Sequence, residues 1–141
     1  MKKTKKPKSN GHPKIIGYSK LKKILDVKFS AYIRQKYADK FGMAECFTCG
    51  VRLPWQKLQN GHYVSRTYLS LRWDERNCHP QCMPCNVWKH GAMDDYALKL
   101  QAKYGENILY ELWQERNKPK KFTQAELRVL IDHYSKVVGV L

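Results

Sequence analysis

Two Cys-x-x-Cys pairs enclose one stretch of the sequence, and polar residues of catalytic types lie between and just after them. The pairs are Cys46/Cys49 and Cys82/Cys85. Four thiolates in two such pairs suit tetrahedral Zn²⁺, because each short pair can wrap one side of the ion. We therefore predict one structural zinc held by these four cysteines. A closed set of four sulfur ligands leaves no open position, so this ion is not expected to catalyse a reaction itself.

Other chemistry is conceivable for the cysteines. Disulfide bonds are one alternative, although a reducing, intracellular compartment favours metal binding by paired cysteines. Redox exchange at a Cys-x-x-Cys motif is a weaker alternative, because two pairs occur here without a strand–helix–strand context. Cys78, the fifth cysteine, lies outside both pairs and is interpreted as a packed or free thiol.

The spacer between the pairs has 32 residues, from Gly50 to Gln81, so it must hold structure of its own. His62 lies in it on a predicted strand, and Asn77 stands five residues before the second pair. Asn86 directly follows that pair. Any one of these residues alone is most often structural. Together they fall on the strand, loop and helix that the zinc would hold together.

This order resembles a known superfamily of enzymes. A strand histidine followed by Asn-x4-Cys-x-x-Cys-Asn-x-x-Lys resembles the HNH, or ββα-metal, nucleases. A longer match resembles the NinG (Rap) recombination endonucleases of lambdoid phages. The matching segments are 61–63, 71–77, 79–86 and 89–91, within a stretch from Cys46 to Tyr104 that is under half of the chain.

The resemblance implies a divalent-metal-dependent endonuclease that hydrolyses phosphodiesters in branched recombination intermediates, such as Holliday junctions and D-loops. His62, neutral near pH 7, is then the group that takes a proton from water. By the family pattern, Asn86 is a ligand of a catalytic Mg²⁺ or Mn²⁺ ion. By the same pattern, Asn77 fixes the loop and the orientation of His62.

One position departs from the pattern. Many members of the wider class place Asp or His just before the catalytic histidine as a metal ligand, where this chain has Gly61. Either the ion is held by fewer protein ligands and more water, or another residue substitutes. The candidate substitutes are His79, Glu75, Asp74 and His90. His79 and Glu75 come first because they lie in the matching stretch, whereas a surface ion pair or a backbone hydrogen bond would also explain them.

The charge predicts a polyanionic partner. Lys and Arg number 27 against 12 Asp and Glu, a formal net charge of +15, and residues 1–40 hold 13 of the former and 2 of the latter. No window approaches the ~20 apolar residues that a membrane span needs, so DNA is the expected partner and a membrane is not. The candidate DNA-binding residues are Arg66, Arg72, Arg76, Lys89, Lys22 and Lys23, although any single lysine is more often plain solvated surface.

The elements that must position these residues indicate a small α+β fold, a zinc-held ββα-metal core with helices at both ends. Residues 1–17 are predicted to be a flexible basic arm, and 18–141 a single domain. Within the domain, 18–42 form a basic amphipathic helix capped by Ser19, 43–91 form the core, and 92–141 are helical. In the core, 58–65 and 69–73 are strand candidates, 76–81 a loop, and 85–90 a short helix. Thr123 to Glu126 match a capping box for a last helix.

Three further expectations concern function and setting. A non-catalytic zinc module that binds nucleic acid is the main alternative, and a protein adaptor using the apolar face of 123–141 is a weaker one. Cutting a four-way junction symmetrically favours a two-fold homodimer. The basic N-terminus lacks an apolar segment, so we expect a cytoplasmic location, in a bacterium or a phage-infected host cell.

Overall fold

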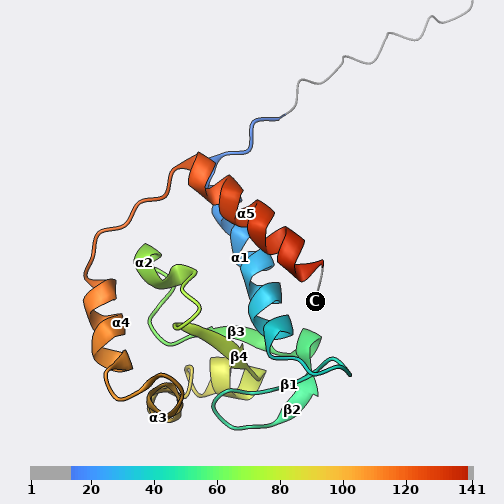
Figure 1. Cartoon of the computed structure of the whole chain (residues 1–141), viewed down its shortest axis with the longest axis vertical. Helices are drawn as coiled ribbons and strands as arrows, with labels where there is room; N and C mark the ends of the chain where they lie inside the picture. Colours follow the sequence, from blue (N-terminus) through green and yellow to red (C-terminus); the bar gives the residue numbers. More distant parts are fainter. Residues whose placement is uncertain (1–13, 140–141) are drawn as a thin grey trace, which may run out of the picture.

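The computed structural model describes residues 14–139, so most of the arm predicted for residues 1–17 lies outside the described residues. Helices surround two small antiparallel hairpins (Figure 1), which confirms the mixed α+β class. The first and last helices lie side by side, and two more cover the opposite side of the hairpins.

Helix α1 (Tyr18–Lys36) forms because apolar residues recur every fourth position and bury one face. Leu21, Leu25, Phe29 and Ile33 make up that stripe. The helix ends six residues before the expected residue 42, because the next segment makes a tight turn of its own. Ser19 is not the cap: Gly17 holds that position, and no side chain caps the helix.

Helix α5 (Gln124–Val138) packs along α1 and begins where the sequence predicts. Its capping box is confirmed: the Thr123 hydroxyl accepts from the Glu126 amide, and the Glu126 carboxylate accepts from the Thr123 amide. The ring of Tyr134 packs edge-on against Phe29 of α1, with centroids 5.0 Å apart. α1 and α5 therefore share one apolar core.

The first hairpin joins β1 (Met43–Glu45) to β2 (Arg52–Pro54), and a 3₁₀ turn, η1 (Trp55–Lys57), follows. The second joins β3 (Gln59–His62) to β4 (Cys78–Gln81), with His62 opposite Cys78. The strand carrying His62 is therefore confirmed.

Two segments have a different secondary structure from the one expected. Residues 76–81 were expected to be a loop, yet they contain β4, whose four residues are all buried and so lack the alternation that signals a strand. Residues 69–73 were expected to be a strand, yet they contain the single-turn helix α2 (Leu69–Arg72). Leu71 is buried there beneath the helices α3 (Met93–Tyr104) and α4 (Ile108–Arg116), and helical geometry directs it to them.

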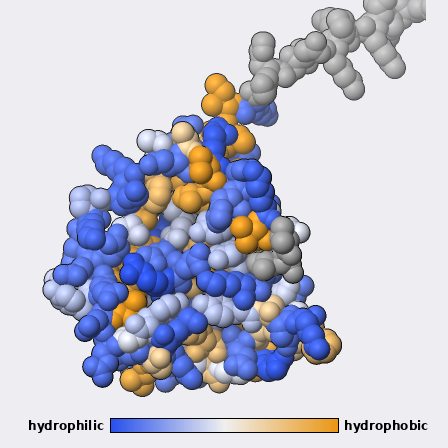
Figure 2. All heavy atoms as spheres, viewed as in Figure 1, coloured by the Kyte–Doolittle hydropathy of each residue, from blue (hydrophilic) through white to orange (hydrophobic). Residues whose placement is uncertain are grey.

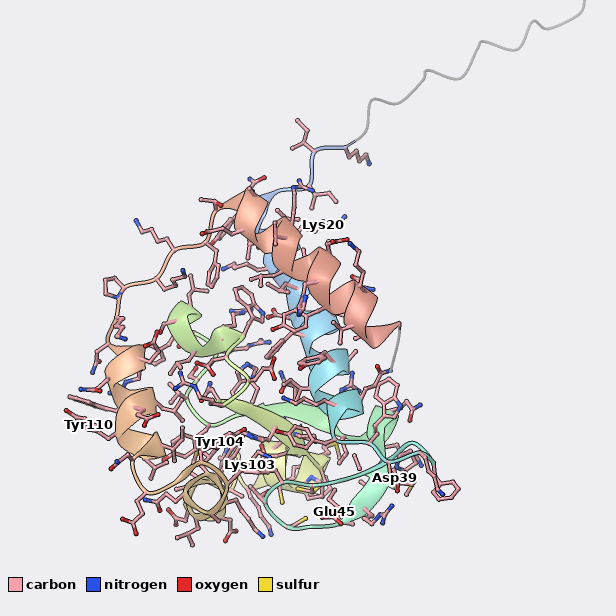
Figure 3. The ribbon with its side chains drawn as sticks, viewed as in Figure 1. Lys20, Asp39, Glu45, Lys103, Tyr104 and Tyr110 are labelled. Carbon is pink, nitrogen blue, oxygen red and sulfur yellow. The ribbon has the colours of Figure 1, made fainter. Side chains whose placement is uncertain are left out.

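The remaining elements are helical, as expected. A single π-type turn, η2 (Pro84–Trp88), follows the second cysteine pair. Helix α3 (Met93–Tyr104) ends at Gly105, and α4 (Ile108–Arg116) follows it. Figure 3 shows Lys103 and Tyr104 at the end of α3, directed toward the second hairpin.

The surface seen in Figure 2 is mostly hydrophilic, with apolar residues in small separate spots. Within residues 14–139, none of the helices is both long enough and apolar enough to cross a membrane.

Candidate functional site

One cleft gathers residues from α1, β3, the loop after β3, and η2. Its volume is about 530 Å³. His62 from β3 and Asn86 from η2 both line it, together with Arg66 from the loop. The cleft thus joins three segments that are far apart in sequence, α1, β3 and η2. It is lined by two of the three catalytic candidates, His62 and Asn86.

The His62 ring is held by a backbone carbonyl. Its Nε2 lies 2.9 Å from the carbonyl oxygen of Arg72. A carbonyl oxygen only accepts hydrogen bonds, so Nε2 carries the proton, and in the neutral ring Nδ1 keeps its lone pair. Burial lowers the pKa of His62 below its ordinary value, although the Arg72 carbonyl and the Asp26 carboxylate partly oppose this. The ring is therefore a neutral base near pH 7.

Asn77 does not line the cleft but holds together the loop that runs between His62 and β4. It is fully buried. Its Oδ1 accepts from the Val64 amide at 2.7 Å, and its Nδ2 donates to the carbonyl oxygens of Val64 and Leu71, at 2.9 and 3.1 Å. Both ends of the loop are thereby tied to one side chain. The His62 ring itself is oriented by its hydrogen bond to the Arg72 carbonyl, one residue after the Leu71 carbonyl that Asn77 binds.

Asn86 lines the cleft from η2. Its Nδ2 donates to Oε1 of Gln59 at 2.7 Å. That bond fixes the amide plane and leaves Oδ1 without a hydrogen-bond partner among the described residues. An amide oxygen is a ligand type that Mg²⁺ and Mn²⁺ accept. Because Asn86 directly follows Cys85, the cysteine cluster also sets its position.

Gly61 has no room for the side chain that the wider class carries there. A Cβ atom at this position would lie 2.0 Å from Oε1 of Gln81. The Gln81 side chain is fully buried, and its Nε2 donates to the hydroxyl of Thr48 and to the carbonyl of Gly91. An acidic ligand cannot be accommodated at position 61 unless Gln81 moves.

His79 and Glu75, the two leading substitutes, are not brought to the cleft. His79 is buried, and its Nδ1 and Nε2 lie 3.0 and 2.9 Å from the hydroxyls of Tyr96 and Tyr104. Burial lowers its pKa to about 3, which keeps the ring neutral. Glu75 pairs with Lys36 and accepts from the hydroxyl of Tyr32.

Of the two remaining candidate ligands, His90 and Asp74, only His90 reaches the cleft. His90 lines the cleft, and its backbone φ of 51° is left-handed, which costs energy for a residue with a side chain. Asp74 instead pairs with Arg76 at 2.7 Å. His90 is thus the only member of the four predicted substitutes that reaches the cleft of the described chain.

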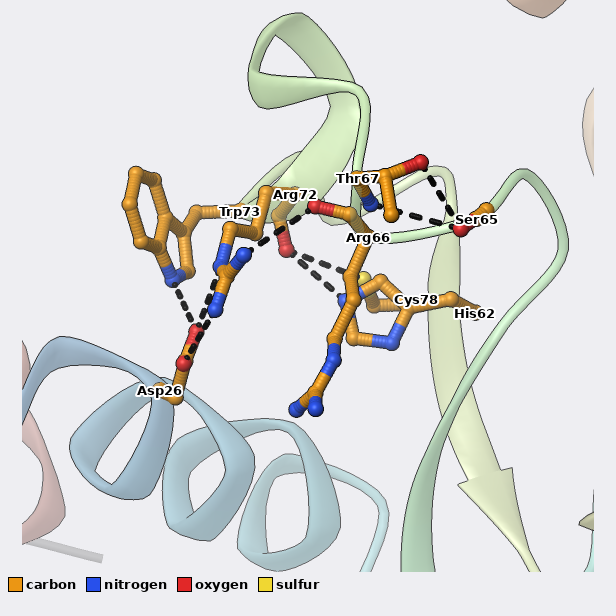
Figure 4. Close-up of polar contacts among 8 residues, drawn as sticks. All are labelled: Asp26, His62, Ser65, Arg66, Thr67, Arg72, Trp73 and Cys78. Atoms are coloured by element: carbon orange, nitrogen blue, oxygen red, sulfur yellow. Dashed lines mark hydrogen bonds and ion pairs between the residues drawn. The ribbon is translucent and has the colours of Figure 1, made fainter. Parts of the chain in front are cut away.

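The predicted DNA-binding residues are also divided. Arg66 and Arg72 line the cleft, and the Arg66 guanidinium extends past the His62 ring toward α1 (Figure 4). Arg72 is committed to an ion pair with Asp26, and Arg76 to pairs with Asp74 and Glu111. Lys22, Lys23 and Lys89 do not line the cleft.

The four cysteines come together as the spacing predicts. Their sulfur atoms all lie within 4.8 Å of one another. The Sγ atoms of Cys49 and Cys82 are 3.7 Å apart, close to the edge of about 3.8 Å that a tetrahedron with Zn–S bonds of about 2.3 Å has. Burial raises the pKa of Cys82 to about 12, whereas hydrogen bonds from Thr48 and backbone amides overcome burial and lower that of Cys46 to about 6. The cluster can hold one metal ion such as zinc.

The cleft is also lined by Asp26, Arg34 and Gln59, which the sequence does not single out as site residues. Asp26 and Arg34 come from α1, where they looked like parts of its polar face, and Gln59 opens β3. Arg34 donates to the Leu58 carbonyl at 3.3 Å and so ties α1 to the strand. Their partners lie 24 to 47 residues away, so no local spacing pattern could have found them.

Comparison with known proteins shows sequence similarity well beyond the residues of the cleft. The sequence matches the family model described as "Bacteriophage Lambda NinG protein" over residues 2–141. It is 31% identical over 108 residues to protein ninG of Escherichia phage 933W, covering 76% of this chain and 51% of that protein. Identity is 29% to protein ninG of Escherichia phage lambda and 30% to that of Salmonella phage P22, each covering 76% of this chain and 50% of the relative.

The chain thus spans about half the length of the curated relatives that it matches. No solved structure matches it significantly.

Proposed function

The chain belongs to the NinG family, and from this premise we propose that it is a divalent-metal-dependent DNA endonuclease of the HNH, or ββα-metal, type. The observation that carries the proposal is that His62 and Asn86 line the same cleft. Each is held by a hydrogen bond that leaves its reactive atom free. β3 and β4 form an antiparallel pair, with α2 between them in sequence, and the helical turn η2 follows β4. This arrangement supports the ββα-metal type.

Hydrolysis of a phosphodiester needs an activated water and stabilisation of charge on the phosphorus oxygens. Nδ1 of His62 accepts the proton from the water as it attacks. The Arg66 guanidinium is placed to hold a phosphate oxygen beside the ring. Asn86 would bind Mg²⁺ or Mn²⁺ through Oδ1. When bound, that ion supplies charge neutralisation at the scissile phosphate and the leaving oxygen.

The residues present fit such an ion, with water completing its shell. The only acidic side chain that lines the cleft within residues 14–139 is Asp26, which is paired with Arg72. A single amide ligand suits Mg²⁺, because this ion usually keeps several waters and also takes phosphate oxygens from the substrate.

We propose branched recombination intermediates, Holliday junctions and D-loops, as substrates. The net charge of +15 supports a DNA partner, and the likeness to the recombination endonucleases supports the branched class. Two symmetric cuts at a junction favour a two-fold homodimer. Sedimentation of the complex with a junction tests the dimer, and one protomer per junction would contradict it.

The proposal is tested by His62→Ala, with His133→Ala as the matched control. His133 is an exposed histidine on α5, outside the residues that line the cleft. Loss of a general base typically costs about 10²- to 10⁴-fold in rate. We expect nicking of branched DNA with Mg²⁺ or Mn²⁺ to fall by that factor in His62→Ala, with DNA affinity within about twofold of wild type. Undiminished nicking by His62→Ala contradicts the proposal.

A non-catalytic nucleic-acid-binding module is the second candidate, and the absence of a ligand side chain at Gly61 favours it. The same assay separates the two functions. Salt-dependent binding of branched DNA by the wild-type chain, without any nicking in Mg²⁺ or Mn²⁺, supports the binding module.

A further inference from the structure

The carboxylate of Asp26 lies on the α1 side of the cleft and binds two consecutive residues of the distant loop. It accepts from Arg72 through Nε at 2.9 Å and through Nη2 at 2.6 Å. It also accepts from Nε1 of Trp73 at 3.0 Å. The side chains of Asp26 and Arg72 are only 23% and 14% exposed, so water screens this pair less than a surface pair.

These two residues flank a peptide unit that matters at the site. The carbonyl of Arg72 belongs to the peptide bond between residues 72 and 73, and it is the group that accepts from Nε2 of His62. Figure 4 shows the Asp26 carboxylate contacting the side chains on both sides of that carbonyl. Arg72 also donates to the Arg66 carbonyl at 3.3 Å, which ties in the preceding part of the loop.

We propose that Asp26 is a positioning residue that keeps the Arg72 carbonyl against the His62 ring and thereby selects the tautomer with Nδ1 free. The inference rests on the proposed nuclease function for its consequence in catalysis. Asp26 acts through Arg72 and needs no contact with DNA. A carboxylate suits the role because its two oxygens match the two parallel N–H groups of the arginine fork.

A simpler alternative is that Asp26 only joins α1 to the loop and contributes stability. The two interpretations differ at His62. If the contact is merely structural, removing it lowers stability and leaves the ring in one tautomer. If Asp26 positions the carbonyl, removing it releases the Nε2–H bond, and both neutral tautomers become populated.

The first test is Asp26→Asn, which keeps the shape but cannot accept both arginine N–H groups. The readout is the pair of ¹⁵N shifts of the His62 ring, recorded above the pKa of His62. We expect two distinct shifts in wild type and values drawn together in the variant. Nicking at saturating DNA should fall about 10- to 100-fold, the scale of a misplaced catalytic group. DNA affinity should not fall, because the change removes a negative charge beside the cleft.

Asp39→Asn is the matched control. Asp39 also pairs with an arginine, Arg52, and accepts from two backbone amides, those of Phe41 and Met43. It lies outside the residues that line the cleft. We expect this variant to lower the melting temperature while the His62 shifts and the nicking rate stay at wild-type values.

Arg72→Lys is the second variant, and it decides the matter if Asp26→Asn does not fold. Lysine keeps the charge but cannot make two parallel hydrogen bonds, so the His62 shifts should again draw together. Distinct, wild-type shifts in a folded Asp26→Asn or Arg72→Lys overturn the inference. If wild type nicks and His62→Ala does not, yet Asp26→Asn nicks normally, Asp26 is not a positioning residue. If wild type does not nick but the shifts change, the nuclease proposal fails and the positioning role stands.

Discussion

Single residues show how closely the strand is packed beside the candidate base. Gly61 is a position where a backbone and a side chain approach each other: Oε1 of Gln81 stands where a Cβ would be, and it has no hydrogen-bond partner among the described residues. Gln81 cannot swing away freely, because its Nε2 is held by Thr48 and Gly91.

Gly61→Ala should therefore destabilise the fold, by about 1–3 kcal/mol as in other overpacked cores. Adding Gln81→Ala should recover part of that loss, because the two side chains compete for one space. Urea unfolding of the two single variants and the double variant measures the coupling. Strictly additive effects would show that the crowding at Gly61 is not the cause.

The elements of the fold were predictable where one chain segment carries its own signal. α1, α3, α4 and α5 show apolar stripes at helical spacing, and the capping box at Thr123 is a purely local pattern. The secondary structure of β4 and α2 was predicted wrongly. β4 is buried on all sides and α2 is buried under other helices, so neither shows a local hydrophobic periodicity in the sequence.

The same distinction applies to the site. His62 and Asn86 were found because their spacing to the cysteines is fixed along the chain. Asp26 and Gln59 were missed because each acts on a partner far away in sequence. A contact between α1 and a loop more than 40 residues later is set by tertiary packing, which a single sequence does not display.

Thr123→Ala should lower the free energy of unfolding by about 1 kcal/mol, the usual value of a lost N-cap. Ser19→Ala is its control, because Ser19 makes no capping bond and should change stability by less than about 0.5 kcal/mol. Denaturant titration of both variants checks the pair. An equal loss in both would mean that neither hydroxyl acts as a cap.

At the scale of the whole molecule, the cysteine cluster joins the first hairpin, the end of β4 and the start of η2. Three of its cysteines are buried beside Ala44 and Leu58 in one small core. A metal ion bound there would supply a large part of the folding energy of so small a core.

Chelation should therefore unfold the hairpins and change the fluorescence of Trp55, while α1 and α5 keep part of their helical signal. We expect about one zinc per chain in wild type. Cys82→Ser should lose it, whereas Cys78→Ser should keep it, since Cys78 lies outside the cluster. Full zinc content in Cys82→Ser would contradict the four-cysteine site.

The pairing of α1 with α5 also bears on how the chain is made. The ribosome releases α1 well before α5, the helix that covers Leu25 and Phe29. Contacts between segments about 100 residues apart close slowly, because a long loop must be ordered first. The nascent chain thus carries an uncovered apolar helix until α5 has been synthesised, and this core is completed only then.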